Sequence, residues 1–433
     1  MNTVINSGNT AWILTSASLV FLMTPGVAFF YGGMVRAKAV LNMLMMEAAA
    51  LSVTILIWGL WGWSIAYAGH SVGGVFGDPA TGFLLRDTMV AGQDGVFTSA
   101  GLNDNAYPAS VDVAFQAAFA MITVALICGA IAERVKYSTW MIFVALWVTF
   151  DYAPLAHMVW NNGLLSADGP ISQAIGAAAH DFAGGTVVHI NAAMAALVIV
   201  LIIGKRKGFG VEPMRPHNVP FVMLGAFLLW FGWFGFNAGS AFAANGTAGY
   251  AWVSTSLAAG AAMLAWGFTE KIRTGHYTAI GAASGIVAGL VAITPAADVV
   301  SPIWSIVLGA IAGVCTCLAC SLKYKFGYDD SLDVVGVHGV GGLIGTVALG
   351  FFMQDTGLFC GGDWRQLVVQ IVIAVIAMAY AAVITTIIAF ALEKTIGWRV
   401  TQAQEVSGID LADQGERAYD FSATASSVIR EVK

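Results

Sequence analysis

Charged side chains are scarce in this sequence of 433 residues, because Asp, Glu, Lys and Arg make up only 10% of it. An average soluble domain contains about 25%. A soluble enzyme or nucleic-acid-binding protein of this length would need a far more charged surface, so both classes are nearly excluded. The apolar content of 58% excludes disorder for most of the chain. A polytopic helical membrane protein is therefore expected.

Cysteine and proline are also few. The five cysteines are odd in number and four lie in apolar runs, so neither a disulfide framework nor a metal-spaced cluster is expected. With 50 glycines and only 10 prolines in no regular period, the chain is not collagen-like. No nucleophile–base pair is recognisable, so a membrane enzyme is the least favoured class and no cofactor is expected.

Apolar runs of about 20 residues, the length that a helix needs to span a bilayer, are what the sequence contains in abundance. They are continuous rather than alternating, which favours helices over barrel strands. Residues 1–10 are predicted to precede an eleven-helix transmembrane domain over 11–392, which a polar tail over 393–433 follows. The eleven runs begin near Ala11, Leu41, Val111, Ser138, Ala183, Val219, Gly249, Thr278, Pro302, Asp333 and Gln366.

The distribution of Lys and Arg predicts the orientation of the bundle. Of the 19 basic residues, 17 fall in the tail or in loops on the tail's side, and only Arg86 and Arg365 fall on the other side. Cytoplasmic loops carry the excess of Lys and Arg. The N-terminus is therefore expected outside the cell, and the tail is expected in the cytoplasm as a regulatory appendage.

Two of the runs suggest an internal repeat. Span five contains His189 among glycines after Asp181, and span ten contains His338 among glycines after Asp333. Five spans separate them, so a second copy of a five-helix repeat would run in the opposite direction, with the eleventh helix added. Such inverted repeats place a substrate path near the bilayer midplane. Each aspartate is expected to cap its helix.

Histidines inside apolar runs are functional candidates, because ionisable groups in a membrane face the protein interior or a water path. His189 and His338 match each other in the repeat, which favours function over a structural role. His157 lies near the outer end of span four and is more simply explained as a side chain that snorkels to the membrane interface.

Aromatic residues converge on one membrane face. Phe115 and Phe119 are four residues apart on span three and share a helix face. Trp160 ends span four and Ser240 follows span six, both on the outer side. An interfacial aromatic belt is the rival interpretation. A cluster of rings with a hydroxyl would suit a small cation, since cation–π attraction reaches about 2 kcal/mol when desolvated.

Several stretches resemble the ammonium transporter (Amt/Rh) family, and closely its bacterial members, over about Trp12 to Tyr419. Taken together and in this order along the chain, these stretches are highly specific for the family. The stretches are Pro25-Gly-Val-Ala-Phe-Phe-Tyr-Gly-Gly33, Ala132-Glu-Arg134, Pro154-Leu-Ala-His-Met-Val-Trp160, Asp181-Phe-Ala-Gly-Gly-Thr-Val-Val-His189-Ile-Asn191, Gly232-Trp-Phe-Gly-Phe-Asn-Ala-Gly-Ser240, Ile293-Thr-Pro295 and Asp333-Val-Val-Gly-Val-His-Gly339.

The resemblance implies a protein of the cytoplasmic membrane with the ammonium-transporter fold. It also implies a homotrimer in which each subunit has one narrow pore. It assigns an outer ammonium-recruitment site, a phenyl gate below it and an apolar pore. The recruitment residues are Phe119, Trp160 and Ser240, with Phe115 beside them and Asp181 in support. The gate is Phe119 and Phe236, and the pore residues are His189, His338 and Thr294.

The resemblance also implies a regulatory partner, because in relatives similar surfaces dock a PII signal protein. Here they are the loop Lys205–Gly210 and the tail Gly408–Tyr419, in which Gln414 stands where relatives commonly have His. Glu47, inside span two, is a second departure from the pattern of the relatives. It is expected at a subunit interface or in a polar pocket. An ammonium sensor of the same fold and a Rh-type channel for a small neutral gas are the alternatives.

Overall fold

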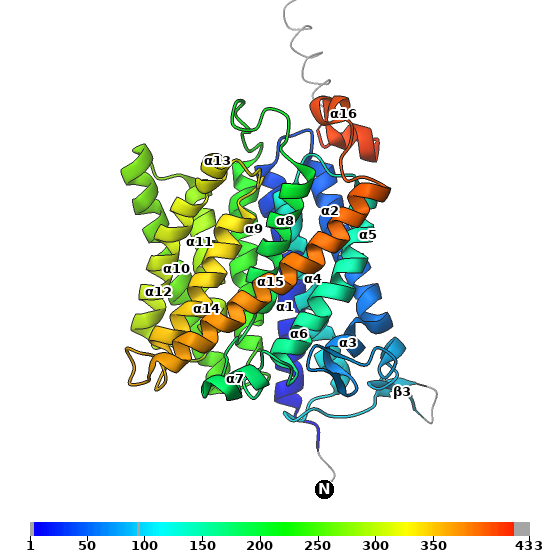
Figure 1. Ribbon diagram of the computed structural model, residues 1–433, viewed down its shortest axis with the longest axis vertical. Helices are drawn as coiled ribbons and strands as arrows, with labels where there is room; N and C mark the ends of the chain where they lie inside the picture. The colour runs from blue at the N-terminus through cyan, green and yellow to red at the C-terminus, as the bar shows by residue number, and fades with distance from the viewer. Residues whose placement is uncertain (1–3, 93–95, 420–433) are drawn as a thin grey trace, which may run out of the picture.

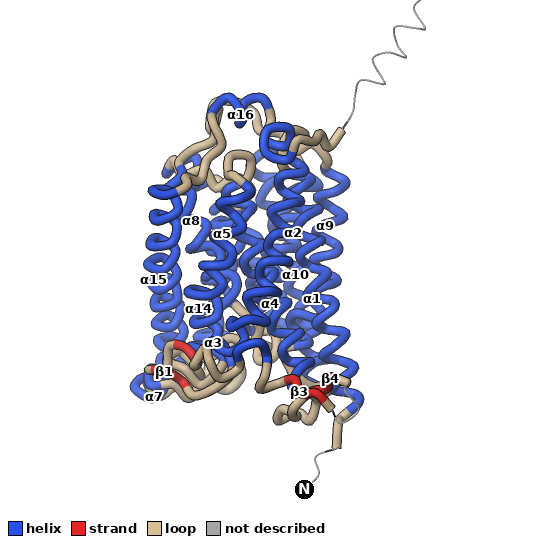
Figure 2. The backbone as a smooth tube through the Cα atoms, turned by 90° about the vertical axis from the view of Figure 1, so that its right-hand side faces the viewer, coloured by secondary structure: helices blue, strands red, loops and turns tan. Residues whose placement is uncertain are grey.

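The computed structural model describes residues 4–92 and 96–419. Within them, 11 helices are long and apolar enough to cross a membrane, which confirms the predicted number of spans. The helices stand side by side in one bundle (Figure 1). The chain starts at one end of the bundle, and α16 lies at the other. We call these the N-terminal end and the tail end. Figure 2 gives the same arrangement from the side.

The spans consist of single helices or of a short helical turn joined to a longer helix. In order they are α1 (Ser7–Met34); α2 (Val40–Ile57) with η1 (Trp58–Gly62) and α3 (Trp63–Tyr67); α4 (Ala109–Ile131); α5 (Tyr137–Trp147) with η3 (Val148–Tyr152) and α6 (Ala153–Trp160); η4 (Gly185–Ile190) with α8 (Asn191–Ile203); α9 (Val219–Trp233) with η5 (Phe234–Ala238); α10 (Gly246–Thr274); α11 (Ala279–Ile293) with η6 (Thr294–Ala296); α12 (Pro302–Ala319) with α13 (Leu322–Phe326); η7 (Val335–Gly339) with α14 (Val340–Phe352); and α15 (Trp364–Thr395).

The helices begin where side chains cap them. The side chains of Asn6, Asn218, Asn245, Thr278 and Asp363 each accept a hydrogen bond from a backbone N–H in the first turn of the following helix. A cap satisfies donors that have no partner inside the helix. Because Asn6 is such a cap, the first span begins at Ser7, earlier than the apolar run alone predicted.

Five spans contain a π-helical turn, in which the hydrogen bonds reach one residue further than in an α-helix. These turns are η1, η3, η4, η5 and η7. His189 lies in η4, Phe236 in η5 and His338 in η7. Such turns are rare and occur often at functional sites. One residue predicted for the gate and two predicted for the pore therefore sit on irregular turns.

The connections gather at the two ends. Between α3 and α4, two small antiparallel sheets lie at the N-terminal end (Figure 2), formed by β1 (Ser71–Val72) with β2 (Phe76–Gly77) and by β3 (Met89–Ala91) with β4 (Phe97–Ser99). The turns η2 (Phe83–Leu85) and α7 (Pro170–Ile175) lie outside the bundle. At the tail end, α16 (Gln402–Ser407) and η8 (Asp410–Gln414) form the described part of the tail. Residues 420–433 of the predicted tail lie outside the described residues.

Glycine lets the spans approach closely around the pore. A Cβ atom added at Gly225 of α9 would lie 2.3 Å from the backbone nitrogen of Phe30 in α1. One added at Gly342 of α14 would lie 3.0 Å from the Cβ of His189. Small residues allow backbones to meet in this way in membrane helices. The packing of α14 against η4 therefore sets the distance between the two histidine-bearing spans.

Candidate functional site

A cavity of about 330 Å³ opens at the N-terminal end of the bundle. We call it the vestibule. It brings together all four residues that the sequence placed on this face, although they come from three different spans. Its lining residues are Tyr67, Asn103, Asp104, Asn105, Tyr107, Asp112, Phe115, Gln116, Phe119, Trp160, Asn161, Phe182, Ser240 and Phe242.

The aromatic rings of the vestibule are held at defined angles. The ring centroids of Phe115 and Phe119 are 4.8 Å apart, and the Trp160 ring meets Phe119 edge-on at 6.1 Å. Trp160 is fixed because its Nε1 donates to the backbone oxygen of Asp181 over 2.8 Å. The Ser240 hydroxyl donates to the Phe236 carbonyl over 2.8 Å, which leaves its oxygen lone pairs available as acceptors.

A stacked pair of phenyl rings closes the bottom of the vestibule. Phe119 and Phe236 lie with centroids 4.2 Å apart and their planes 12° from parallel. Both side chains are buried. Phe119 lines the vestibule, and Phe236 lines a second cavity beyond it. The pair therefore separates the two cavities.

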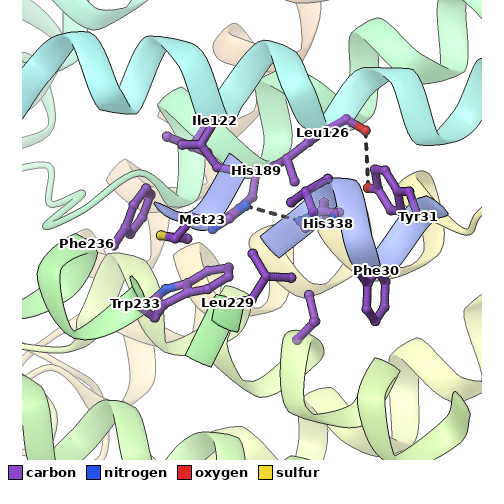
Figure 3. Close-up of a pocket in the computed structure, with 13 residues that line it drawn as sticks. Met23, Phe30, Tyr31, Ile122, Leu126, His189, Leu229, Trp233, Phe236 and His338 are labelled. Carbon is purple, nitrogen blue, oxygen red and sulfur yellow. Dashed lines mark hydrogen bonds between the residues drawn. The ribbon is translucent and has the colours of Figure 1, made fainter. Parts of the chain in front are cut away.

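The second cavity, which we call the lumen, is narrow and almost entirely apolar. Its cavity volume is about 10 Å³, close to the smallest space that can hold one water molecule. Figure 3 shows the labelled side chains around it. The lining residues are Met23, Val27, Phe30, Tyr31, Ile122, Leu126, Val188, His189, Leu229, Trp233, Phe236, Val287 and His338.

The two histidines meet in the lumen. Their Nδ1 atoms are 3.3 Å apart, as the dashed line in Figure 3 marks, and both side chains are buried. Within the described residues, Nε2 of His189 has no hydrogen-bond partner. A hydrogen bond between two Nδ1 atoms requires one to donate and the other to accept. The pair of neutral rings then presents one Nε2 lone pair and one Nε2–H group.

Trp233 forms the wall beside His189. Its ring stacks on the imidazole with centroids 5.5 Å apart and planes 19° from parallel. Its Nε1 donates to Oγ1 of Thr294 over 2.8 Å, and the threonine hydroxyl donates to the Leu290 carbonyl. Thr294 thus lies behind Trp233 and holds the indole, whereas the sequence placed it on the pore wall itself.

Asp181 caps the histidine-bearing turn η4. Its carboxylate accepts from the backbone N–H groups of residues 184–187 at 2.6–3.2 Å and from the hydroxyl of Thr186. This carboxylate is saturated with donors, as the capping role expected from the sequence requires. Its backbone carbonyl meanwhile anchors Trp160, so Asp181 joins the wall of the vestibule to the turn that carries His189.

The profile of the Ammonium Transporter Family matches residues 11–419 of the chain. An ammonium transporter of Mycobacterium tuberculosis (strain H37Rv) is 48% identical, over 98% of this chain and 93% of its own length. One from Aquifex aeolicus is 45% identical over 96% and 94%. The chain belongs to the ammonium transporter family.

Solved structures of the family share the fold. The crystal structure of Saccharomyces cerevisiae Mep2 superposes with a TM-score of 0.81 at 33% identity, covering 92% of this chain and 89% of that one. A structure described as a sensor Amt protein superposes with a TM-score of 0.84 at 27% identity, covering 94% and 98%. The ammonium-transporter fold expected from the sequence is confirmed.

The aspartate that caps the second histidine turn is Asp330. Its carboxylate accepts from the backbone N–H groups of Val334 and Val335 at 3.0 and 2.7 Å. Asp333, which the sequence suggested as the cap, instead forms an ion pair with Lys323 at 2.8 Å. Asp330 precedes His338 by eight residues, the same spacing as from Asp181 to His189. The match between the two segments of this transporter is therefore closer than the sequence alone suggested.

Other polar groups inside the spans lie away from the lumen. His157 does not snorkel to the interface as the sequence suggested, because it is buried, with its ring nitrogens 2.7 Å from the Ser71 hydroxyl and 3.0 Å from the Ala66 carbonyl. Glu47 is buried, with Oε1 2.8 Å from the Cys128 thiol and Oε2 without a hydrogen-bond partner among the described residues.

Two carboxylates inside the spans were not predicted from the sequence. Asp151, in η3, is fully buried, and neither of its oxygens has a hydrogen-bond partner in the described part of the chain. Asp112, in the first turn of α4, lines the vestibule. Both interrupt apolar runs, a signal that points to function by default. Within residues 4–92 and 96–419, no group of three or more His, Cys, Asp or Glu could hold a metal ion.

A buried charge network ties the loops together at the tail end. Arg206 pairs with Asp329 at 2.9 Å and with Glu133 at 3.3 Å. Burial alone would raise the pKa of Glu133, but the hydrogen bond to Arg36 and the charge of Arg206 outweigh it and lower the pKa. Arg206, the middle residue of the basic stretch Lys205–Lys207, is thus structural, while its two neighbours are exposed.

The tail folds back onto this network. Glu405 accepts from the backbone N–H of Lys207 over 2.6 Å and pairs with Arg399. Further on, the carboxylate of Asp410 accepts from the N–H groups of Leu41 and Asn42 at 3.1 and 2.8 Å, at the start of α2. The tail is therefore joined directly to the loop after α8 and to the second span.

Proposed function

We propose that this protein carries ammonium nitrogen across the cytoplasmic membrane by recruiting ammonium in the vestibule, removing its proton and passing ammonia through the lumen. The observation that carries the proposal is the pair of imidazoles 3.3 Å apart in an apolar lumen. The stacked rings of Phe119 and Phe236 separate that lumen from the vestibule.

Recruitment uses the vestibule rings and the hydroxyl of Ser240. Ammonium placed among Phe115, Phe119 and Trp160 gains cation–π attraction of about 2 kcal/mol when water is removed. The free lone pairs of the Ser240 oxygen accept one of its hydrogens. Asp181 supports the site indirectly, because its carbonyl holds Trp160 in place.

Deprotonation follows from the cost of moving a bare cation into the lumen, which is many kcal/mol in an apolar medium. Ammonium escapes that cost by giving up a proton, and potassium cannot. Ammonia then meets the two Nε2 positions of His189 and His338, one of which accepts a hydrogen bond while the other donates. The released proton either stays outside or is relayed along the histidines.

The arrangement in the cell is part of the same proposal. The excess of Lys and Arg at the tail end supports an N-terminus outside and a tail in the cytoplasm. The matching Asp–His segments of η4 and η7 support two inverted five-helix repeats followed by the eleventh helix. The assembly is a homotrimer with one pore in each subunit. A PII signal protein docks on the loop Lys205–Gly210 and the tail Gly408–Tyr419.

The first experiment measures current in proteoliposomes of the purified protein after an ammonium concentration jump, beside His189→Ala. A transient current that potassium does not evoke means that charge moves, either as ammonium or as ammonia with a relayed proton, and its loss in His189→Ala supports a role of the histidines in that movement. Internal alkalinisation above that of empty liposomes without current means that the proton stays outside.

Two other outcomes would overturn the proposal. Ammonium binding without current or alkalinisation would assign the protein to the sensors. Faster carbon dioxide equilibration without ammonium transport would assign it to the Rh-type gas channels.

A further inference from the structure

Two carboxylates line the vestibule, the exposed Asp104 and the half-buried Asp112, and the recruitment site uses neither. Phe115, Gln116 and Phe119 follow Asp112 by three, four and seven residues on α4, and all four line the vestibule. Residues at this spacing share one helix face. With a rise of about 1.5 Å per residue, Asp112 lies about 10 Å in front of Phe119 along the helix axis.

The charge of Asp112 is not neutralised within the vestibule. None of the 14 residues that line the cavity is Lys or Arg, and the described residues provide Asp112 with no ion pair. Its one hydrogen bond is from the Tyr107 hydroxyl to Oδ1 at 3.3 Å. Burial and the charge of Asp112 raise the pKa of Tyr107, so the phenol stays protonated and continues to donate. Oδ2 is left for a cation.

The groups next to Asp112 are held in place. Gln116 accepts from the Tyr67 hydroxyl over 2.9 Å, which fixes its amide in the cavity wall. The Asn103 side chain accepts from the backbone N–H groups of Asn105 and Tyr107 at 3.1 and 3.2 Å, and so positions the phenol that bonds Asp112. The carboxylate therefore has a fixed place at the vestibule wall rather than on a free loop.

We infer that Asp112 forms an outer cation subsite, which concentrates small monovalent cations about two helical turns in front of the aromatic rings. The inference rests on the proposed function, because it supplies the cation that the aromatic site then selects. A carboxylate on the wall of the vestibule attracts ammonium, methylammonium and potassium alike. The subsite consequently raises the local concentration of all these cations, while the aromatic rings and the phenyl pair discriminate between ammonium and potassium.

A purely structural role for Asp112 is the alternative. The carboxylate lies in the first turn of α4, where a negative charge stabilises the helix dipole. That role would affect the stability of the protein but not the dependence of uptake on substrate and salt. Kinetics therefore separate the two roles.

The test is uptake of labelled methylammonium into proteoliposomes containing full-length protein, at low and high ionic strength. Asp112→Asn is expected to raise KM about 3- to 10-fold at 10 mM salt and to leave Vmax unchanged. The Debye length shortens from about 30 Å at 0.01 M to about 10 Å at 0.1 M. Salt should therefore raise KM in the wild type and have little effect in Asp112→Asn.

Asp168→Asn is the matched control, because it removes the same charge from an exposed position at the same end of the bundle, outside the vestibule. Asp112→Glu should restore the wild-type KM and salt dependence. Asp112→Ser, which still suits the first turn of a helix, replaces Asp112→Asn if that variant does not fold.

Equal KM and equal salt dependence in Asp112→Asn and Asp168→Asn would overturn the inference. If Trp160→Leu raises KM in the same assay, the recruitment site survives and only the outer subsite is lost. If the wild-type protein takes up no more methylammonium than empty liposomes, the proposed function itself fails.

Discussion

The indole Nε1 of Trp233 donates a hydrogen bond to Oγ1 of Thr294 over 2.8 Å. Because the same indole stacks on His189, Thr294 acts on the lumen through Trp233. Thr294→Val keeps the shape of the side chain but leaves a buried N–H without a partner, which costs about 1–3 kcal/mol. We expect a lower melting temperature and slower methylammonium uptake.

Thr294→Ser, which retains the hydroxyl, is the control and should behave like the wild type. In a double-mutant cycle, Thr294→Val should lower the melting temperature and the uptake rate little further in a Trp233→Phe background, because the indole donor is already absent. Additive losses in the two backgrounds would contradict the positioning role of Thr294.

The phenyl pair is expected to exclude hydrated ions. Phe236→Leu removes the ring that lies 4.2 Å from Phe119 and opens a path between vestibule and lumen. We expect a potassium current in proteoliposomes that the wild type does not carry. Phe231→Leu is the matched control, since Phe231 lies in α9 of the same span and is 55% exposed. If the Phe236→Leu protein carries no potassium current, the result argues against a gate at this position.

An ion pair at the N-terminal end should make stability depend on pH. Nε2 of His180 lies 2.9 Å from Oδ1 of Asp298. Burial alone would lower the pKa of His180, but the hydrogen bond and charge of Asp298 outweigh it and raise the pKa. The pair therefore contributes fully below about pH 6.5, the ordinary histidine pKa, and its contribution is lost as pH rises through the raised value.

Asp298→Asn should accordingly lower the melting temperature most at pH 5–6, and the difference from the wild type should shrink towards pH 9. The exposed Asp168→Asn serves as a control without such a trend. A difference that stays constant over this range would mean that His180 remains neutral.

The contact between the tail and α2 is expected to hold the tail in place. Asp410→Ala removes the acceptor of two backbone N–H groups at the start of α2, and loss of such a cap costs about 1 kcal/mol. We expect faster cleavage of the tail by added protease. Glu416→Gln changes an exposed charge of the same tail and should leave the cleavage rate unchanged. Identical cleavage of all three proteins would contradict this contact.

The sequence predicted the spans well because each must bury about 20 apolar residues in lipid, whatever its neighbours are. It also placed Phe115, Phe119, Trp160 and Ser240 at one end of the bundle, and the vestibule contains all four. Helix periodicity and span direction are sufficient for that prediction, since both are local properties of the chain.

The relations that local pattern did not reveal depend on tertiary contacts. The cap of η7 was assigned to Asp333 because it directly precedes the apolar run, but Lys323 takes that carboxylate and Asp330 serves instead. The family resemblance placed Thr294 on the pore wall, and nothing in its own segment indicates that the Trp233 indole of α9 donates to it. Arg206 looks like its two lysine neighbours in sequence, and only the fold brings Asp329 and Glu133 to it.

The small volume of the lumen has a consequence for inward and outward transport. A space of about 10 Å³ holds one water-sized molecule at a time, so on the proposed path molecules moving inward and outward would share a single file and block one another. Tracer exchange at equilibrium should then be slower than net flux down a gradient. The ratio of the two fluxes counts how many molecules queue between Phe236 and the far side of the histidines.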